Sequence, residues 1–327
     1  MSVIAFPSKL GLGLAAVGRP AYITLGRMHD LGGDRSVDTM YARTAALLDA
    51  AWAAGVRYLD VARSYGRAEE FLARWMRERS IADGEAVVGS KWGYRYTAGW
   101  RMDADVHEQK EHSVERFREQ LAESEVLLGG RLSLYQIHSA TLESGCLDDE
   151  RLLAALVEAR GRGAFAALGL TLTGPRSAAT LERALAVRVD GRRVFDVVQA
   201  TFNVLEPSLA GGLAAAQAAG VGVIAKEVFA NGRLSPANLR PEDAALLAAL
   251  DASSVESGLT IDQLAVAWVV SHRFVDVALS GAAAPEQVVS HRAAVERTLT
   301  STVLDGLGRL AEAPERYWAT RATLPWS

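Results

Sequence analysis

Four ionisable side chains stand at or just after the ends of short apolar runs in the first half of the chain. Asp60 lies in VRYLDV, and Tyr65 follows it by five positions. Lys91 ends AVVGSK, and His138 ends LSLYQIH. If these runs are parallel strands of one barrel, their carboxyl ends meet at one face. We therefore expect the four side chains to face a common centre.

The types of these four residues suit proton transfer to an oxygen atom. A phenol with an ordinary pKa of about 10 is a poor proton donor at neutral pH unless a nearby cation stabilises its phenolate. We expect Lys91 to be that cation and to lower the pKa of Tyr65, while Asp60 keeps the ammonium charged and oriented. His138 would share a hydrogen bond with the substrate oxygen or assist the proton transfer. Carbonyl reduction needs such a group, and its hydride must come from a cofactor.

Each of these residues also has an ordinary structural interpretation. An aspartate in a strand-to-helix loop often caps a helix, and a lone lysine or histidine is usually solvated or bonded within the fold. The combination is harder to explain in this way, because successive strands each deliver an ionisable residue at the same level. The pattern therefore favours a catalytic group.

Eight apolar runs alternate with eight segments of helical periodicity along the chain. The expected strands are 10–15, 56–61, 86–91, 132–138, 166–171, 196–201, 221–226 and 275–280. The expected helices are 36–55, which has Ser36 as N-cap, and 67–79, 108–128, 148–162, 176–187, 208–219, 260–272 and 285–298. This alternation predicts an α/β fold, a (β/α)8 TIM barrel with parallel strands, as a single domain over residues 1–327. A doubly wound sheet is the alternative, but GLGLAA has Ala16 where the dinucleotide-binding pattern needs its third glycine.

Three stretches have no regular pattern: 16–35, 92–107 and the tail after 313. The first two follow expected strands, so they should lie on the catalytic face of the barrel as candidate substrate loops. Aromatic residues that could wall a pocket are Tyr22, Trp92, Tyr94, Trp100, Tyr317, Trp318 and Trp326.

Composition limits the partners of the protein. The net charge of −4 gives no indication of nucleic-acid binding. Cys146 is the one cysteine, which excludes a disulfide framework and a multi-cysteine zinc site and fits a reducing, cytoplasmic location. No run of 18 apolar residues and no signal-peptide pattern is present, so no membrane association is expected. His107 and His112 lack the spacing of a helical metal pair, and no metal is expected.

The segments GVRYLDVARSYGRAEEFLARWM, GSKWGY and LYQIHSA, in this order, resemble the aldo-keto reductase superfamily. Its members are eight-stranded barrels that bind nicotinamide cofactors in an extended pose. The resemblance covers nearly the whole chain and assigns Tyr65 as the general acid, assisted by Lys91, Asp60 and His138. It implies an NAD(P)H-dependent oxidoreductase that reduces an aldehyde or ketone, or oxidises the matching alcohol.

The resemblance also extends to the cofactor. VQATFNVLEP, VGVIAKEVFANGRL and LSGAAAPEQVV are similar to the sixth, seventh and eighth strands of the family with the loops that follow them. The implied cofactor-binding residues are Thr171, Gln199, Lys226, Phe229, Asn231, Gly232, Arg233, Leu234, Gly281, Ala282 and Gln287.

Several positions depart from the family pattern. Leu172 cannot bond a carboxamide, and Lys226 stands where an aromatic residue commonly stacks on the nicotinamide, so that an inward ammonium would repel the cationic pyridinium. Ala283 replaces an arginine that binds the 2′-phosphate in many relatives, although Arg233 or Arg292 could compensate. NADP(H) remains the favoured cofactor, with NAD(H) as the alternative.

Two other functions remain open. The chain could be a cofactor-binding regulatory or scaffold protein with little turnover, as potassium-channel β subunits show for this superfamily. It could also be an aldolase-like barrel in which Lys91 forms a Schiff base, although Asp60 favours the charged ammonium. Arg63, close to Asp60 and Tyr65, is either an idle loop cation or a contact for an anionic substrate. The carbonyl substrate and the oligomeric state do not follow from the sequence.

Overall fold

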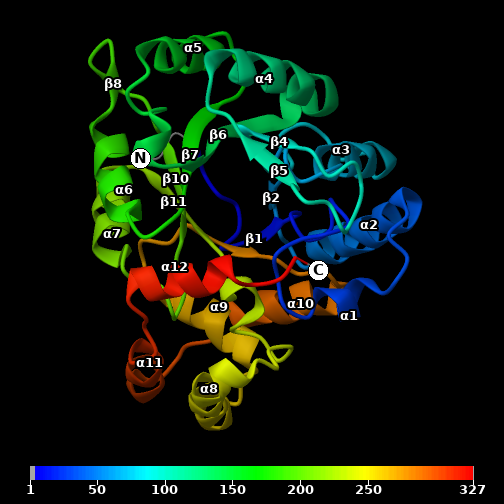
Figure 1. Cartoon of the computed structure of the whole chain (residues 1–327), viewed down its shortest axis with the longest axis vertical. Coiled ribbons are helices and arrows are strands. Elements are labelled where there is room, and N and C mark those ends of the chain that lie inside the picture. Colours follow the sequence, from blue (N-terminus) through cyan, green and yellow to red (C-terminus); the bar gives the residue numbers. More distant parts are fainter. Residues whose placement is uncertain (1–3, 327) are drawn as a thin grey trace.

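The computed structural model describes residues 4–326, and its centre is a closed parallel barrel (Figure 1). The strands follow one another around it in the order β1, β12, β11, β10, β7, β6, β3 and β2. Their bounds are β1 Leu10–Gly13, β2 Tyr58–Asp60, β3 Val87–Trp92, β6 Leu132–Ala140, β7 Ala167–Leu172, β10 Val197–Thr201, β11 Gly222–Lys226 and β12 Val277–Ser280. Each falls on an apolar run of the sequence, because strands of such barrels are covered on both faces. The predicted (β/α)8 TIM barrel is confirmed.

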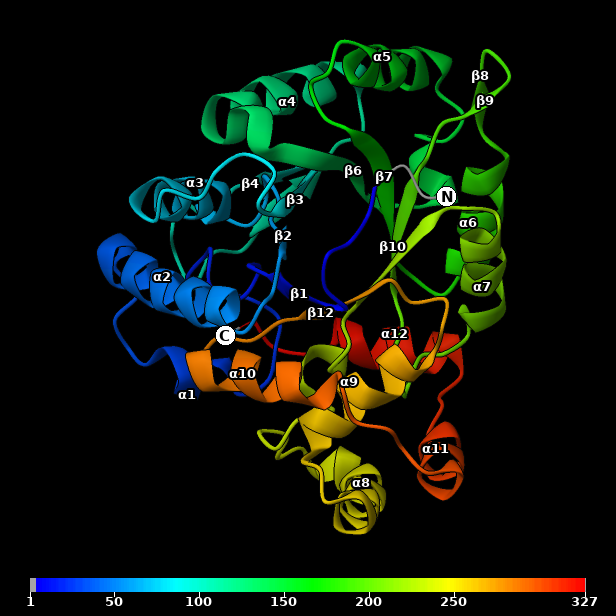
Figure 2. The ribbon, with the colours of Figure 1, turned by 180° about the vertical axis from the view of Figure 1, so that it is seen from behind.

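Helices surround the barrel on the outside, as Figures 1 and 2 show from opposite sides. Those that alternate with the strands are α2 Val37–Ala53, α3 Ala68–Glu78, α4 Val114–Leu128, α5 Glu150–Gly161, α6 Ser177–Ala186, α7 Ala210–Ala218, α9 Ile261–Ser271 and α10 Pro285–Ala294. Ser36 caps α2, since its side chain accepts a hydrogen bond from the Thr39 amide.

Two buried clusters hold the layers together. The larger cluster lies mainly between the strands and the outer helices. The smaller fills the barrel interior below the site and includes Tyr58, Leu134, Val197 and Ile224. Phe6 packs edge-on against Tyr58 with ring centroids 5.3 Å apart. Side chains therefore fill the barrel interior, as is usual for this fold.

Helix α4 begins later than predicted. The sequence placed its start at 108, but Glu108–Lys110 forms strand β5, which pairs antiparallel with β4, Tyr94–Tyr96. The helix starts only after Ser113, whose side chain accepts from the Arg116 amide at 3.1 Å. Glu108 thus belongs to a hairpin and lines a cavity, and it is not part of a surface helix.

Regular structure also occurs where none was predicted. The additional elements are α1 Arg27–Leu31, η1 Gly129–Arg131, η2 Leu142–Ser144, β8 Arg188–Val189, β9 Arg192–Arg193, η3 Ala230–Gly232, η4 Pro241–Asp243, α8 Ala244–Ser257, α11 Ser301–Gly308 and α12 Pro314–Ala322. The tail after 313 was predicted to be irregular, and this was wrong. Helix α12 begins with Pro314, a residue suited to the first helical position, and buries Tyr317.

Helix α12 lies across one face of the barrel in Figure 1. Beyond it, Trp326 forms an isolated antiparallel bridge with Ile23 in the loop after β1. Residues near both ends of the chain therefore meet over the barrel.

Within residues 4–326, no single helix is long and apolar enough to cross a membrane. The segments Pro241–Ser257 and Ile261–Ser271 meet that criterion only when taken together, and the chain bends by 78° between them.

Candidate active site

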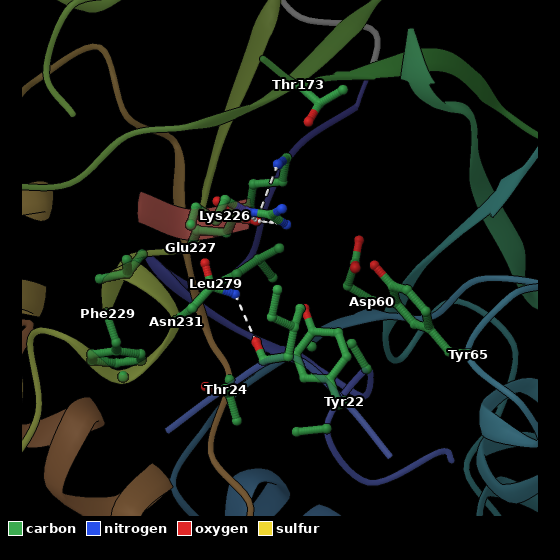
Figure 3. A pocket seen from close by; sticks show the side chains of 18 of the residues that line it. Tyr22, Thr24, Asp60, Tyr65, Thr173, Lys226, Glu227, Phe229, Asn231 and Leu279 are labelled. Carbon is green, nitrogen blue, oxygen red and sulfur yellow. Dashed lines mark hydrogen bonds and ion pairs between the residues drawn. The ribbon is translucent and has the colours of Figure 1, made fainter. Parts of the chain in front are cut away.

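A cavity of about 380 Å³ opens among the loops at the carboxyl ends of the strands (Figure 3). Asp60, Tyr65 and His138 all line it. Lys91 lies directly behind this wall, at the end of β3. The predicted convergence of the four side chains thus occurs, because neighbouring parallel strands end at the same level.

The carboxylate of Asp60 is bound by three side chains. Lys91 Nζ donates to Asp60 Oδ1 and, at 3.0 Å, to the Val61 carbonyl. Asp60 Oδ2 accepts from the Tyr58 hydroxyl at 3.0 Å and from Gln199 Nε2 at 2.8 Å. Both charged side chains are at most 3% exposed. A buried ion pair is sustained by such further hydrogen bonds, which satisfy its remaining donors and acceptors.

Two loops fix the position of Tyr65. Its amide donates to the Ala62 carbonyl at 3.0 Å, and the next residue, Gly66, has a φ of +61°. A Cβ on Gly66 would lie 2.5 Å from the Gly18 carbonyl, and a Cβ on Gly18 would lie 2.4 Å from the Tyr65 carbonyl. The loop after β1 and the loop after β2 approach this closely because both residues are glycines.

The phenol of Tyr65 faces a charged and aromatic environment. Lys91 Nζ lies 4.7 Å from the centre of the Tyr65 ring. Burial, and then the negative charge of Asp60, raise the pKa of Tyr65 well above its ordinary value. Burial and Asp60 thus act against the lowering of this pKa that was expected from Lys91. The phenol keeps its proton at neutral pH, which is the state that a general acid requires.

His138 lies beside Tyr65, with ring centroids 5.5 Å apart. Its Nδ1 is 3.4 Å from Ser64 Oγ. Burial, followed by the charges of Lys91 and Lys226, lowers the pKa of His138 well below its ordinary value. The imidazole is therefore neutral at physiological pH, and a neutral imidazole can donate one hydrogen bond to an oxygen.

About half of the predicted cofactor-binding residues line the cavity. These are Gln199, Lys226, Phe229, Asn231, Gly232 and Gly281. The remainder, Thr171, Arg233, Leu234, Ala282 and Gln287, do not line it.

Other contacts hold Thr171 and Arg233 away from the cavity. Thr171 Oγ1 accepts from the Ser139 amide at 2.7 Å, and Thr173, two positions later, reaches the cavity instead. Arg233 is buried between two carboxylates, Asp243 and Glu312.

Gln287 sits at the start of α10. Its Oε1 accepts from the Ala283 amide at 2.9 Å, and its Nε2 donates to Asp30 at 2.9 Å. Arg292, in the last turn of this helix, pairs with Glu296 just beyond the end of the helix. These contacts therefore bring no arginine to the position of Ala283, where many relatives have the arginine that binds the 2′-phosphate.

Two of the candidate wall aromatics, Tyr22 and Trp326, line the cavity. The guanidinium carbon of Arg19 is 5.0 Å from the ring centre of each. Trp92, by contrast, is fully buried and packs against Phe117 with ring centroids 5.1 Å apart.

Several charged residues of the wall were not predicted from the sequence: Arg19, Glu108, Glu227 and Arg321. Arg19 and Glu108 pair at 2.8 Å. Arg321 belongs to α12, a helix that was not predicted, so nothing in the sequence indicated that Arg321 lies at this cavity. Arg63 does not line the cavity, because it pairs with Glu69 and Glu123.

The fold and the cavity together define a parallel-barrel protein with a buried phenol, ammonium, carboxylate and imidazole at the carboxyl ends of its strands. A model of the Aldo/keto reductase family matches residues 22–312. The chain therefore belongs to the aldo/keto reductase family, and membership supports an oxidoreductase of the kind that uses a nicotinamide cofactor.

Solved structures agree in fold. The aldo-keto reductase AKR11C1 from Bacillus halodurans, in its holo form, is 20% identical, with a TM-score of 0.68 over 95% of this chain and 96% of that chain. PA4992 from Pseudomonas aeruginosa, provisionally described as an aldo-keto reductase, is 20% identical, with a TM-score of 0.61 over 88% of this chain and 89% of that chain. No curated protein matches this chain significantly.

The cavity wall suits a nicotinamide cofactor. Asn231 Oδ1 is buried and has no hydrogen-bond partner among residues 4–326, which leaves an acceptor for a ligand. A Cβ on Gly281 would meet no atom within 4 Å, so this part of the wall is open. Gln199 brings a carboxamide to the cavity beside Asp60. Leu172, which cannot replace the polar residue of relatives, packs in the large core cluster.

Proposed function

We propose that this protein is an NAD(P)H-dependent oxidoreductase that reduces an aldehyde or ketone, or oxidises the matching alcohol. The observation that carries the proposal is the protonated phenol of Tyr65, which faces the cavity beside the buried pair of Lys91 and Asp60. Family membership supports the same class of reaction.

The roles follow from the contacts of the residues. A bound nicotinamide supplies the hydride that reduces the carbonyl carbon. Tyr65 donates its proton to the carbonyl oxygen as that oxygen gains negative charge. The ammonium of Lys91, 4.7 Å from the ring centre, stabilises the phenolate left behind. Neutral His138 donates a hydrogen bond that orients the substrate oxygen, and Asp60 holds Lys91 in place.

The cofactor would lie along Gln199, Phe229, Asn231, Gly232 and Gly281, since these residues share the cavity wall. NADP(H) is the proposed cofactor, with NAD(H) as the alternative. The preference for NADP(H) rests on the family resemblance alone, since Arg233 and Arg292 both pair with carboxylates. Fluorescence titration of the protein with NADPH and with NADH decides the preference.

Replacement of Tyr65 by phenylalanine tests the assignment. Tyr65→Phe should reduce turnover by about 100-fold or more, the contribution typical of general acid catalysis, because it removes the donated proton. Loss of NADPH or NADH absorbance over a panel of aldehydes and ketones measures the rate. Wild-type turnover by Tyr65→Phe would show that another group is the acid.

The alternative is a cofactor-binding regulatory or scaffold role. It rests on the unusual residues Lys226 and Leu172 near the proposed nicotinamide position. Tight nucleotide binding without cofactor oxidation in a single-turnover mixture would favour it.

An aldolase-like Schiff base on Lys91 has less support, because Lys91 Nζ already donates to Asp60 and Val61 as an ammonium. Borohydride trapping of a substrate on Lys91 would revive it.

We further propose that residues 1–327 act as one domain, because α12 and the loop after β1 both contribute to one cavity. Residues 1–3 and 327 lie outside the described part of the chain. The proposed partner is a small carbonyl compound or alcohol, in the cytoplasm, without nucleic acid or membrane.

A further inference from the structure

Lys226 presents an ammonium with few partners to the cavity. It ends β11, and its side chain is 16% exposed. Its Nζ donates a hydrogen bond to Thr201 Oγ1 at 2.9 Å. Glu227 Oε1 is 3.8 Å away, which is beyond hydrogen-bond distance. The ring centre of Trp318 is 6.0 Å away. An ammonium has three N–H donors, and the hydrogen bonds seen within residues 4–326 use one of them.

The neighbouring carboxylate of Glu227 is committed to other residues. Arg321 Nε and Nη2 donate to its Oε1 at 2.9 and 2.6 Å. Thr201 Oγ1 donates to its Oε2 at 3.0 Å. Burial would raise the pKa of Glu227, but the charges of Arg321 and Lys226 lower it to about 2. One negative charge therefore faces two cations in this part of the wall.

The other carboxylates of the cavity cannot compensate, because each already has a cation of its own. Asp60 is paired with Lys91, and Glu108 is paired with Arg19. Burial lowers the pKa of Lys226 to about 8, which shows that its charge is poorly solvated. A ligand anion would relieve this unfavourable state.

Lys226 and the proposed acid share one small space. Figure 3 shows Asp60 and Tyr65 on one side of the cavity and Lys226 and Glu227 on another. The charge of Lys226 also acts on His138 in the proposed catalytic group. Tyr65 and Lys226 line the same cavity of about 380 Å³, so a substrate with its carbonyl oxygen at Tyr65 extends toward Lys226 within one enclosed space.

We propose that Lys226 binds a carboxylate of the substrate, so that the preferred substrate is a small oxo acid with its carboxylate a few bonds from the carbonyl carbon. This inference rests on the proposed function and adds the substrate class. The ammonium of a lysine is a point charge and does not bind both carboxylate oxygens in the manner of an arginine. It therefore suits a carboxylate whose second oxygen contacts another residue of the wall.

Matched pairs of acids and neutral esters test this inference. Suitable pairs are pyruvate and methyl pyruvate, 4-oxobutanoate and its methyl ester, and 4-carboxybenzaldehyde and methyl 4-formylbenzoate. They differ in the distance between the carbonyl carbon and the carboxylate. In at least one pair we expect kcat/KM of the acid to exceed that of the ester by about 10- to 100-fold, the range for a hydrogen bond to a charged group.

Variants of Lys226 assign the preference to this residue. Lys226→Met and Lys226→Gln should bring the ratio of acid to ester close to one, mainly through KM of the acid. Lys226→Arg should retain much of it. The matched control is Lys9→Met, because Lys9 Nζ bonds the Val275 carbonyl at 2.6 Å, away from the cavity lining. The control should leave the ratio unchanged.

The outcomes separate this inference from the function on which it rests. Equal kcat/KM for acids and esters with the unaltered chain would overturn the inference alone. So would an acid preference that survives in both neutral variants. If Lys226→Met instead weakens NADPH or NADH binding in a fluorescence titration and lowers both rates equally, Lys226 belongs to the cofactor site. No reduction of any compound would contradict the proposed function and the inference together.

Discussion

At the scale of single residues, Asp60 determines the state of the site more than any other side chain described here. It accepts from Lys91, Tyr58 and Gln199, and it raises the pKa of Tyr65. The carboxylate therefore keeps the lysine in place and the phenol protonated. The charged lysine favours the phenolate that proton donation leaves, whereas the raised pKa holds the proton on Tyr65 until the substrate oxygen becomes strongly basic.

Removing this carboxylate should destabilise the protein as well as the site. We expect Asp60→Asn to lower the free energy of unfolding by about 3 to 5 kcal/mol, because it leaves the buried charge of Lys91 without its partner. Urea denaturation measures the change. Tyr58→Phe is the control, and with one hydrogen bond lost it should cost about 1 kcal/mol. Equal costs for the two variants would show that the ion pair adds no stability.

The pH dependence of kcat/KM should differ between an oxo acid and its ester. Lys226 is charged below about pH 8 and loses its proton above it, since burial lowers its pKa to about 8. The groups that act on it are Glu227, Arg321, Lys91 and Asp60. We therefore expect kcat/KM for an oxo acid to fall above about pH 8, while kcat/KM for its ester stays level over that step. Parallel profiles for acid and ester would contradict a role for this ammonium in binding.

At the scale of elements, the loops after β1 and β2 are joined through two glycines. Gly18 lies against the Tyr65 carbonyl and Gly66 against the Gly18 carbonyl, so closely that neither position has room for a Cβ. The Arg67 amide also donates to the Gly18 carbonyl at 2.7 Å. The position of Tyr65 thus depends on contacts between two loops that are far apart in the sequence.

A methyl group at this contact should displace Tyr65. Gly66→Ala combines a φ of +61° with a Cβ 2.5 Å from the Gly18 carbonyl, so we expect lower stability and lower kcat. The control is Gly258→Ala, whose φ is +67° but whose Cβ would meet nothing within 4 Å. It should show only the backbone strain, about 1 kcal/mol. Thermal unfolding and turnover measure both variants, and indistinguishable results would rule out the loop contact as the cause.

The barrel elements were predictable from the sequence, because each buried parallel strand is an apolar run. All eight strand positions are confirmed. The hairpin of β4 and β5 was not predicted, since YRY and EQK carry no apolar alternation and form strands only by pairing with each other. Helix α12 was missed for a similar reason: it is mostly exposed and has a single buried residue, Tyr317.

At the scale of the whole molecule, the cavity is closed by parts of the chain that lie far apart in the sequence. Arg321 and Trp326 come from the C-terminal region, and Arg19 and Tyr22 from the loop after β1. The bonds from Arg321 to Glu227 tie α12 to the end of β11. We infer that this ion pair holds α12 against the barrel.

Hydrogen exchange tests the attachment of α12. Arg321→Met should increase amide exchange in residues 314–322, because it removes the contacts that fix the helix to Glu227. Arg316→Met provides the control, since Arg316 is exposed on the same helix. Exchange that rises equally in both variants would indicate that helix propensity, and not the ion pair, sets the stability of α12.

The candidate site was predictable only in part, and the reason is physical. Asp60, Lys91 and His138 lie on strands, whose ends share one level, and Tyr65 follows five residues after one of them. Lys226 was also placed correctly at the end of β11. The partners of Glu227 depend on how a distant helix packs, and this is a tertiary contact that no local pattern encodes.

The bridge between Ile23 and Trp326 has a consequence for biosynthesis. Residue 326 must have left the ribosome before the last wall of the cavity can form, so most of the barrel is synthesised before the site is complete.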